Sequence, residues 1–90
     1  MKALLDEIEK RYGFQNISVR LVSENSFLLE RHKDRATISV IAKNTPGKYS
    51  VDVEVPDENV PLIGENKLFV SDDLGLENLY DVIRGFIQGN

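Results

Sequence analysis

Four stretches of this chain alternate apolar with polar residues at a period of two, and only short polar connections separate them. Alternation of this kind is typical of β-strands with one buried face. The apolar positions of the four stretches are Ile17, Val19 and Leu21; Phe27 and Leu29; Ala36, Ile38, Val40 and Ala42; and Tyr49, Val51, Val53 and Val55. The connections are too short for a crossover, so consecutive strands are expected to be antiparallel. The sequence therefore predicts a four-stranded antiparallel meander.

The numbering of the apolar positions tests this topology, because residues that face each other on neighbouring strands must point to the same side. The positions are odd in the first two strands, even in the third and odd in the fourth. The first loop must therefore hold an odd number of residues, and the other two an even number. Loops at residues 23–25, at 33–34 or 32–35, and at 44–47 satisfy this requirement. Asn25 and Gly47 are expected to supply positive φ angles in the first and third turns.

An amphipathic helix is predicted before the strands, from Lys2 to Tyr12. Its apolar residues recur at spacings of three and four, namely Leu4, Leu5, Ile8 and Tyr12. Gly13 is expected to end the helix in the left-handed conformation, with Phe14 folding back on Ile8 as in a Schellman motif.

A second amphipathic helix is predicted after the strands, from Leu74 or Leu76 to Gln88. Its broad apolar stripe consists of Leu76, Leu79, Tyr80, Val82, Ile83, Phe86 and Ile87. The N-cap is expected among Ser71, Asp72 and Asp73, because such side chains accept hydrogen bonds from the first N–H groups and suit the helix dipole. Gly89 is expected to end this helix.

The segment between the fourth strand and the second helix, residues 56–66, contains two prolines and a glycine. These residues predict an irregular connection, because proline lacks a backbone donor. Residues 67–70 are predicted as a short fifth strand. The apolar run at residues 60–63 has two interpretations: it covers the open edge of the core, or it forms an exposed anchor for another protein.

Together these elements predict a single α+β domain over residues 1–90, with both helices on one face of the sheet. A four-stranded sheet is about 19 Å wide, and two helices, each about 10 Å across, would cover one face completely. Nothing in this chain remains to cover the opposite face. The residues expected there are mostly polar, with Val22, Leu28 and Ile41 interspersed. This composition is typical of a solvated sheet face, and the face is also where a partner would bind.

The charge of the chain disfavours nucleic acid as a partner. The formal net charge is −4, and residues 51–90 carry two Lys/Arg against nine Asp/Glu. The order of helix, antiparallel strands and helix resembles that of double-stranded-RNA-binding domains, in element order alone. Such domains place lysines at the start of the second helix, where this chain has Ser71, Asp72 and Asp73. The acidic residues would repel phosphate groups there.

The sequence encodes no disulfide framework and no membrane span. It contains no cysteine, which excludes disulfides and thiolate metal sites and fits a reducing compartment. No apolar run approaches the roughly 18 residues of a membrane-spanning helix, and the first residues turn acidic too early for a signal peptide. We therefore expect a cytoplasmic protein.

The chemically active residue types form no recognised catalytic arrangement. The single histidine, His32, is predicted in an exposed turn between cations, where neither an adjacent nucleophile nor a pocket is expected. Asp52, Glu54, Asp57 and Glu58 lie close in sequence, but their spacing is not that of a calcium loop, and open solvent would keep them ionised. No glycine-rich phosphate loop precedes a helix. The sequence therefore predicts no catalytic residue, no metal site and no cofactor.

These observations favour a non-enzymatic protein-interaction module, such as an adaptor, a chaperone-like protein or an inhibitor, with another protein or a second copy as partner. Its contact surface is predicted on the uncovered sheet face. The residues expected in that surface are Arg20, Val22, Leu28, Glu30, Ser39, Ile41 and Asp52. The alternative is a small enzyme or ligand-binding domain whose site forms only in an oligomer. A ligand of such a domain would raise its melting temperature, which distinguishes the two.

Overall fold

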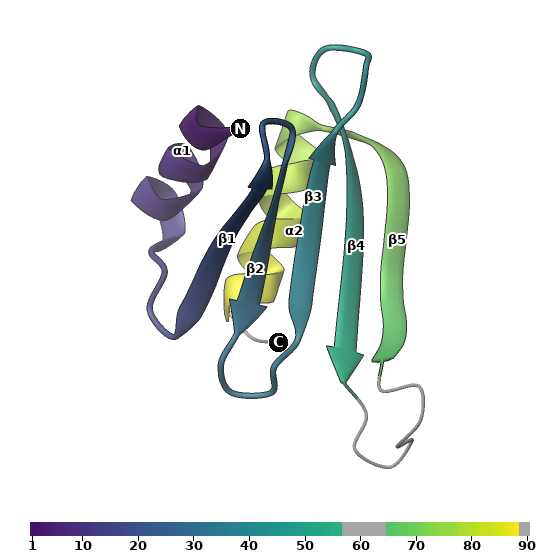
Figure 1. The fold of residues 1–90 in the computed structure, drawn as a ribbon. Coiled ribbons are helices and arrows are strands. Elements are labelled where there is room, and N and C mark those ends of the chain that lie inside the picture. Colours follow the sequence, from purple (N-terminus) through teal and green to yellow (C-terminus); the bar gives the residue numbers. More distant parts are fainter. Residues whose placement is uncertain (57–64, 89–90) are drawn as a thin grey trace.

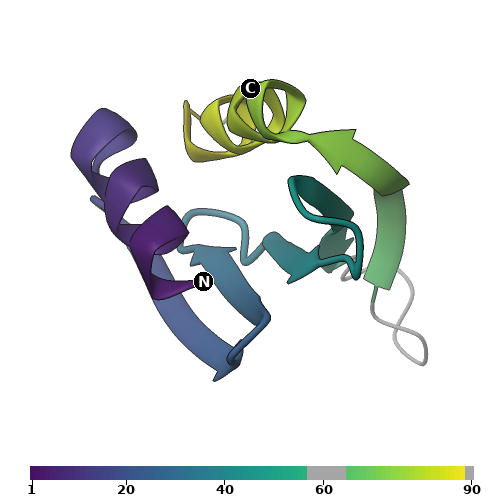
Figure 2. The same ribbon diagram turned by 90° about the horizontal axis from the view of Figure 1, so that it is seen from above.

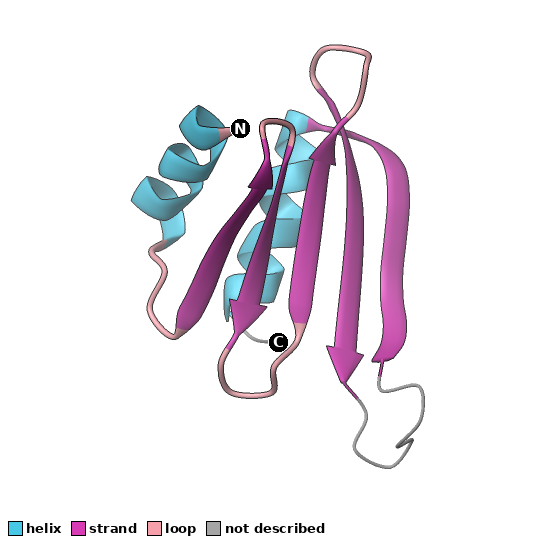
Figure 3. Cartoon of the chain, in the orientation of Figure 1, coloured by secondary structure: helices cyan, strands magenta, loops and turns pink. Residues whose placement is uncertain are grey.

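In residues 1–56 and 65–88, which the computed structural model describes, the chain forms two helices and five strands. In chain order these are α1 (Lys2–Tyr12), β1 (Ile17–Ser23), β2 (Ser26–Arg31), β3 (Thr37–Ala42), β4 (Lys48–Pro56), β5 (Glu65–Gly75) and α2 (Leu76–Gln88). The strands form one antiparallel sheet in the order β1-β2-β3-β4-β5 (Figure 1, Figure 3). The predicted α+β class and the antiparallel meander between two helices are confirmed.

The pairing of β1 to β4 has the register predicted from parity. Arg20 pairs with Leu28, Leu28 with Ser39, and Ser39 with Asp52. These four residues therefore form a row across four neighbouring strands. Because side chains in such a row point to the same side of the sheet, the register brings together residues that are far apart in the sequence.

The turn between β1 and β2 holds two residues, Glu24 and Asn25, instead of the predicted three. Ser23 pairs with Ser26 across the turn, and a register shift just before Ser23 makes Val22 a β-bulge. The Ser23 hydroxyl accepts a hydrogen bond from the Asn25 backbone N–H (3.1 Å). The bulge supplies the residue that the shorter turn lacks, which is why the rest of β1 keeps the predicted register.

Positive φ angles confirm two of the expected positions and correct a third. Gly47 has a φ of 79° in the turn between β3 and β4, and Gly13 has a φ of 76° after α1. The ψ of Gly13 is 162°, which is extended, so the Schellman motif predicted there does not form. Asn25 lacks the expected positive φ, because the added twist of the neighbouring bulge accommodates a turn without it.

β5 is much longer than the strand predicted at residues 67–70. It covers eleven residues along β4, and they include the three expected for the helix N-cap, Ser71, Asp72 and Asp73. That prediction is wrong, and α2 begins directly after the strand. The two aspartates lie at a register shift opposite Ser50, whose hydroxyl donates a hydrogen bond to Asp72 Oδ1 (3.2 Å). Pairing with β4 thus outweighs the low strand propensity of aspartate.

The expected irregular connection is shorter than residues 56–66. Pro56 pairs with Glu65 and Val55 with Asn66, so both ends of that range belong to strands. Residues 57–64 and 89–90 lie outside the described part of the chain, and with them the predicted apolar run at 60–63 and the helix stop at Gly89.

The core lies between the sheet and the two helices, which pack on the same face (Figure 2). Each helix contributes one apolar stripe, and the inward residues of β1 to β4 complete a single cluster. The buried residues of this cluster are Leu5, Ile8, Ile17, Phe27, Leu29, Ala36, Ile38, Val40, Val51, Leu79, Ile83 and Phe86. The alternation in β2, β3 and β4 therefore identified their inward side chains.

The helices do not cover this face completely, contrary to expectation. Val19 and Leu21, predicted as core residues, are 40% and 52% exposed, whereas Ile17 at the start of the same strand is buried. A fifth strand widens the sheet to about 24 Å, which is more than two helices cover. Because α2 lies closest to β4 and β5, the uncovered part falls at the opposite edge, along β1.

Candidate functional site

The seven residues predicted for a partner surface come from four neighbouring strands. They are Arg20 and Val22 in β1, Leu28 and Glu30 in β2, Ser39 and Ile41 in β3, and Asp52 in β4. We call the sheet face opposite α1 and α2 the open face. The register row that contains Arg20, Leu28, Ser39 and Asp52 runs across this face. Val22 and Ile41 lie beyond one side of the row, towards the β1–β2 turn, and Glu30 lies beyond the other.

A groove of about 560 Å³ lies on the open face. Its lining consists of Arg20, Leu21, Val22, Ser26, Phe27, Leu28, Ser39 and Ile41. Five of the seven predicted residues line it, whereas Glu30 and Asp52 do not. Parity assigned Leu21 and Phe27 to the core side, and Phe27 is fully buried there. The bulge at Val22, directly after Leu21, was the feature of this region that sequence analysis missed.

A second hollow continues the groove along β1 and β2. It has a volume of about 350 Å³ and includes Glu30 in its lining. It shares Arg20 and Leu28 with the groove. These two residues therefore separate an apolar end of the open face, near Val22 and Ile41, from a polar end near Glu30.

Large exposed apolar side chains gather at the apolar end. Val22 is 59% and Ile41 48% exposed, and both line the groove, while Leu28 between them is half-buried. Among the residues whose side chains the structure describes, Val19, Leu21 and Leu76 are the other large exposed apolar ones. Four of the five thus lie on β1 and β3. Val19 and Leu21 pair with the core residues Leu29 and Phe27 and so point to the helix side. On the open face, the grouping of Val22 and Ile41 with Leu28 indicates a contact with another molecule.

Charged residues of both signs lie around the open face. Glu30 Oε2 lies 3.9 Å from Arg35 Nε, and Lys43 Nζ lies 3.8 Å from Asp72 Oδ1. All these groups are at least one-third exposed, so each pair contributes little to stability. The charges remain accessible to a partner and would favour one with a complementary pattern.

The polar end of the open face contains a contact that the sequence analysis did not anticipate. Ser18 Oγ lies 2.6 Å from His32 Nε2. The His32 backbone N–H donates to Asn16 O (3.0 Å), which extends the β1–β2 ladder by one pair and places His32 beside Ser18. The expectation that His32 has no adjacent hydroxyl is therefore wrong. The even numbering shared by Ser18, Glu30 and His32 was the signal that could have revealed it.

The expectation that His32 lies outside any pocket is also wrong. A hollow of about 320 Å³ adjoins it. Its lining consists of Gln15, Asn16, Ile17, Arg31, His32, Lys33, Ile87 and Gln88. A hydroxyl and an imidazole in hydrogen-bond contact can exchange a proton, which is the first requirement of nucleophilic catalysis by serine.

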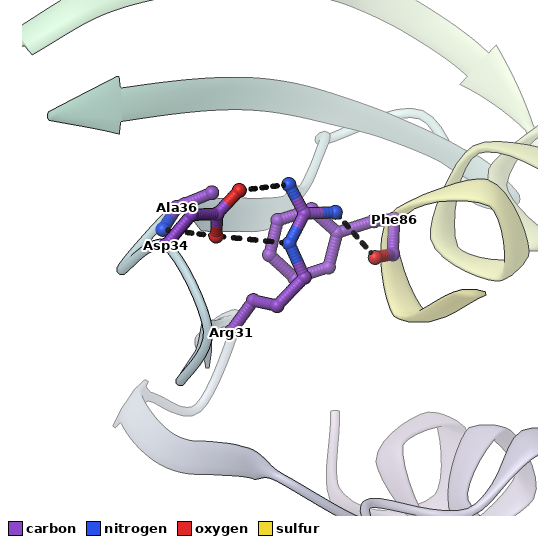
Figure 4. A network of polar contacts seen from close by, with 4 residues as sticks. All are labelled: Arg31, Asp34, Ala36 and Phe86. Carbon is purple, nitrogen blue, oxygen red and sulfur yellow. Dashed lines mark hydrogen bonds and ion pairs between the residues drawn. The ribbon is translucent and has the colours of Figure 1, made fainter. Parts of the chain in front are cut away.

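Arg31, next to His32 in sequence, points to the helix side and donates three hydrogen bonds there (Figure 4). Its Nε and Nη2 donate to the two carboxylate oxygens of Asp34 (3.0 and 2.7 Å), and Nη1 donates to Phe86 O (2.7 Å). The guanidinium also lies 4.8 Å from the centre of the Phe86 ring. Arg31 thus ties the β2–β3 turn to the C-terminal end of α2, where a cation suits the helix dipole.

The same contacts explain the acidity of Asp34. The hydrogen bonds from Arg31, aided by one from the Ala36 backbone N–H and opposed by burial, lower the pKa of its carboxyl to about 2. Each guanidinium nitrogen of Arg31 donates one hydrogen bond within the chain, so these contacts hold the arginine in place beside the adjoining hollow.

The acidic residues considered for a metal site are only partly described. Asp52 and Glu54 are half-buried residues of β4, and Asp57 and Glu58 lie outside the described part of the chain. Within residues 1–56 and 65–88, no three His, Asp or Glu side chains are grouped in a way that would hold a metal ion. No helix of those same residues is long and apolar enough to span a membrane.

Comparisons with protein-family models, with characterised proteins and with solved structures each found no match to this chain. Functional inference therefore depends on the geometry of the open face and of the Ser18–His32 pair.

Proposed function

We propose that the chain is a non-enzymatic protein-interaction module whose open face binds a partner protein. The groove on that face carries the proposal, because it joins the exposed Val22 and Ile41 to Leu28 on a surface that no helix covers. Apolar side chains grouped in a groove and bordered by charged residues are typical of a contact surface. The site consists of Arg20, Val22, Leu28, Glu30, Ser39, Ile41 and Asp52.

The size of the apolar group indicates what kind of complex forms. Three aliphatic side chains bury roughly 200–300 Å², whereas a standard interface buries roughly 800 Å² on each partner. The partner must therefore also contact the charged residues around the groove. Such a complex has moderate affinity and weakens as salt is added, because salt screens exposed charges.

The test compares lysine substitutions on the open face with a matched substitution outside it. Ile41→Lys and Leu28→Lys place a charge in the groove, and Leu76→Lys alters another exposed apolar residue (41%) that does not line it. Lysine is tolerated on a solvated strand but not in a dry contact. We expect all three variants to fold, and only the two groove variants to lose the partners cross-linked to the wild-type chain.

Thermal melting and light scattering complete this test. Equal partner capture by Ile41→Lys and Leu76→Lys would contradict the proposal. A shift from dimer to monomer in the two groove variants would identify the partner as a second copy. Ile41→Lys decides the outcome if Leu28→Lys unfolds, since Ile41 is the more exposed of the two.

The Ser18–His32 contact favours a second candidate function, a small hydrolase that acts on activated esters. His32 would accept the hydroxyl proton as Ser18 Oγ attacks the ester carbonyl, and the ester C–O bond would then break, so that the leaving alcohol or phenol takes the proton from His32 and the acyl group stays on Ser18. Water would release the acyl group as the acid and restore the serine. The test is acetylation of the chain by p-nitrophenyl acetate, followed by mass spectrometry to locate the acetyl group. Loss of that modification in Ser18→Ala and His32→Gln, but not in Ser50→Ala, would support it. No acetyl group on Ser18 would rule it out.

A further inference from the structure

β1 is an edge strand whose outward backbone groups can be assigned from the ladder. Asn16 accepts a hydrogen bond from the His32 N–H, and Ser18 pairs with Glu30 in the same register. In an antiparallel ladder, hydrogen-bonded pairs alternate with pairs that do not exchange bonds. The even residues of β1 therefore bond to β2. The odd ones, including Val19 and Leu21, direct their N–H and C=O groups away from it.

These outward groups have no backbone partner among the described residues. Ile17 N–H bonds to Phe14 O (3.4 Å), but no backbone hydrogen bond outside the β1–β2 ladder involves Val19 or Leu21. The sheet ends at β1, and α1 lies on the same side of the sheet as α2, outward of β1 (Figure 1, Figure 2). Val19 and Leu21 also expose their apolar side chains. This edge thus offers free hydrogen-bonding groups beside free apolar surface.

Protection of this edge is incomplete. Natural sheets protect exposed edges with proline, lysine, charged residues or bulges. β1 has the sequence Ile-Ser-Val-Arg-Leu-Val-Ser, with neither proline nor lysine. Its bulge lies at Val22, beyond the outward pair, and Arg20 is its one charged residue. A strand that adds here would therefore meet Val19, Arg20 and Leu21 in succession.

A second copy of the chain fits this edge poorly. A two-fold axis pairs β1 with itself antiparallel, and the register that uses both outward residues puts Val19 opposite Leu21. Arg20 then faces Arg20 of the other copy, and like charges directly opposite destabilise a sheet. If the second copy is shifted along β1 towards Ile17, the Ile17 N–H must donate a hydrogen bond to it, but this group already bonds to Phe14 O. Sliding it the other way brings in the bulge at Val22.

We propose that β1 accepts an extended segment of another protein by strand addition, and that this segment alternates apolar with acidic residues. Its apolar side chains lie on the helix side against Val19 and Leu21, and an acidic side chain lies on the open face against Arg20. Backbone hydrogen bonds supply affinity, and the alternating side chains supply specificity. The inference rests on the proposed function, since the added strand would border the groove and belong to the same partner.

The experiment uses a fluorescent peptide of about nine residues that alternates valine with glutamate. We expect it to add antiparallel to β1, with its valines paired with Val19 and Leu21. The valine amides then face β1, while those of the glutamates face away. N-methylation of two central valines should weaken binding about tenfold or more, because it removes two backbone donors. N-methylation of two central glutamates is the matched control and should change little. Fluorescence anisotropy measures all three peptides on the unaltered chain.

Charge reversal provides a second, independent readout. Arg20→Glu should lose the valine–glutamate peptide and bind a valine–lysine peptide instead, because opposite charges across a ladder attract and like charges repel. Equal binding of the two methylated peptides, or no binding of the unmodified one, would overturn the inference. So would a dimer of the wild-type chain that forms through β1.

Failure of this inference can be told apart from failure of the proposed function. The peptide experiment depends on the backbone of β1 and leaves the groove unchanged, whereas Ile41→Lys alters the groove and leaves the β1 edge unchanged. Methylation without effect, together with partner loss in Ile41→Lys, would overturn strand addition alone. Partner capture that survives Ile41→Lys would overturn the role of the groove, whatever the peptides do.

Discussion

β3 and β1 share one alternation of apolar and polar residues but have opposite environments. In β3, Ile38 and Val40 are completely buried beneath the helices, whereas in β1 Val19 and Leu21 remain largely exposed. β3 is the middle strand of five, and β1 is an edge. Alternation therefore specifies to which side a side chain points. Whether anything covers that side depends on how many strands the helices must span.

The turns beside β3 are also more firmly held than the turn beside β1. The turn that enters β3 is held by the Arg31–Asp34 ion pair, and the turn that leaves it contains Gly47 at positive φ. The turn that leaves β1 contains Asn25 without positive φ and adjoins a bulge. Substitutions around β3 should therefore be costly, and matched substitutions around β1 should be mild.

The largest expected difference is between Ile38 and Leu21. Ile38→Ala removes a fully buried side chain and leaves a cavity, which typically costs about 2–4 kcal/mol. Leu21→Ala removes a side chain that is half in solvent, so we expect a loss of about 1 kcal/mol or less. Urea denaturation measures both free energies of unfolding. Equal losses would show that β1 is covered in solution, and that its environment does not differ from that of β3.

Asp34→Asn should destabilise the chain by about 1–2 kcal/mol, since it weakens hydrogen bonds from a cation, although one-third exposure of the carboxylate limits the loss. Glu30→Gln is the control, because the Glu30–Arg35 pair is longer and more exposed. We expect a change below about 0.5 kcal/mol there. A comparable loss of stability in both variants would mean that the Arg31–Asp34 contacts stabilise the fold no more than the exposed Glu30–Arg35 pair does.

The lowered pKa of Asp34, about 2 against an ordinary 3.8, adds a pH dependence. A carboxyl that is more acidic in the folded state stabilises it at a pH above the unfolded value. That contribution declines as the pH falls from about 4 to about 2. The difference between wild type and Asp34→Asn in urea midpoint should therefore be constant above pH 5 and shrink towards pH 2. A constant difference at all pH values would contradict the assigned cause.

Gly47→Val should cost about 1–2 kcal/mol, because a side chain is strained at positive φ. The added Cβ would meet no atom within 4 Å at this position, so backbone strain is the only expected source. Asn25→Ala in the β1–β2 turn is the matched change and should cost under about 0.5 kcal/mol. A larger loss of stability from Asn25→Ala than from Gly47→Val would contradict the assignment of a strained backbone position to the β3–β4 turn.

The smallest expected effect is that of Val19→Thr, below about 0.5 kcal/mol, since its side chain is largely exposed and threonine suits an edge strand. Val40→Thr is its counterpart in β3 and places a hydroxyl in the core, where it should cost about 1–3 kcal/mol. Melting temperatures of the two variants are enough to compare them. A large loss from Val19→Thr would indicate that α1 closes over β1.

Much of the open face could be predicted from parity. The rule that facing residues share a side placed Arg20 opposite Leu28 and Leu28 opposite Ser39, as the structure has them. The Ser18–His32 contact was not predicted, because it depends on where the β2–β3 turn begins, and loops of two and four residues both satisfied parity. The even numbering shared by the two residues was the one signal that indicated it. The bulge at Val22 was not predicted for a similar reason, because a three-residue loop and a two-residue turn with a bulge both give the same register of β1 on β2.

The sequence by itself determined the order of the elements, the sides to which the residues of β1 to β4 point, and the position of Gly47, because periodicity and turn chemistry are local properties. Tertiary structure alone decided the length of β5, the exposure of Val19 and Leu21, and the contact of Arg31 with Phe86, which lie 55 positions apart. Each of these depends on a partner element elsewhere in the chain. β4 pairs with the residues of β5 on both sides of its aspartates, and two helices are too narrow for five strands.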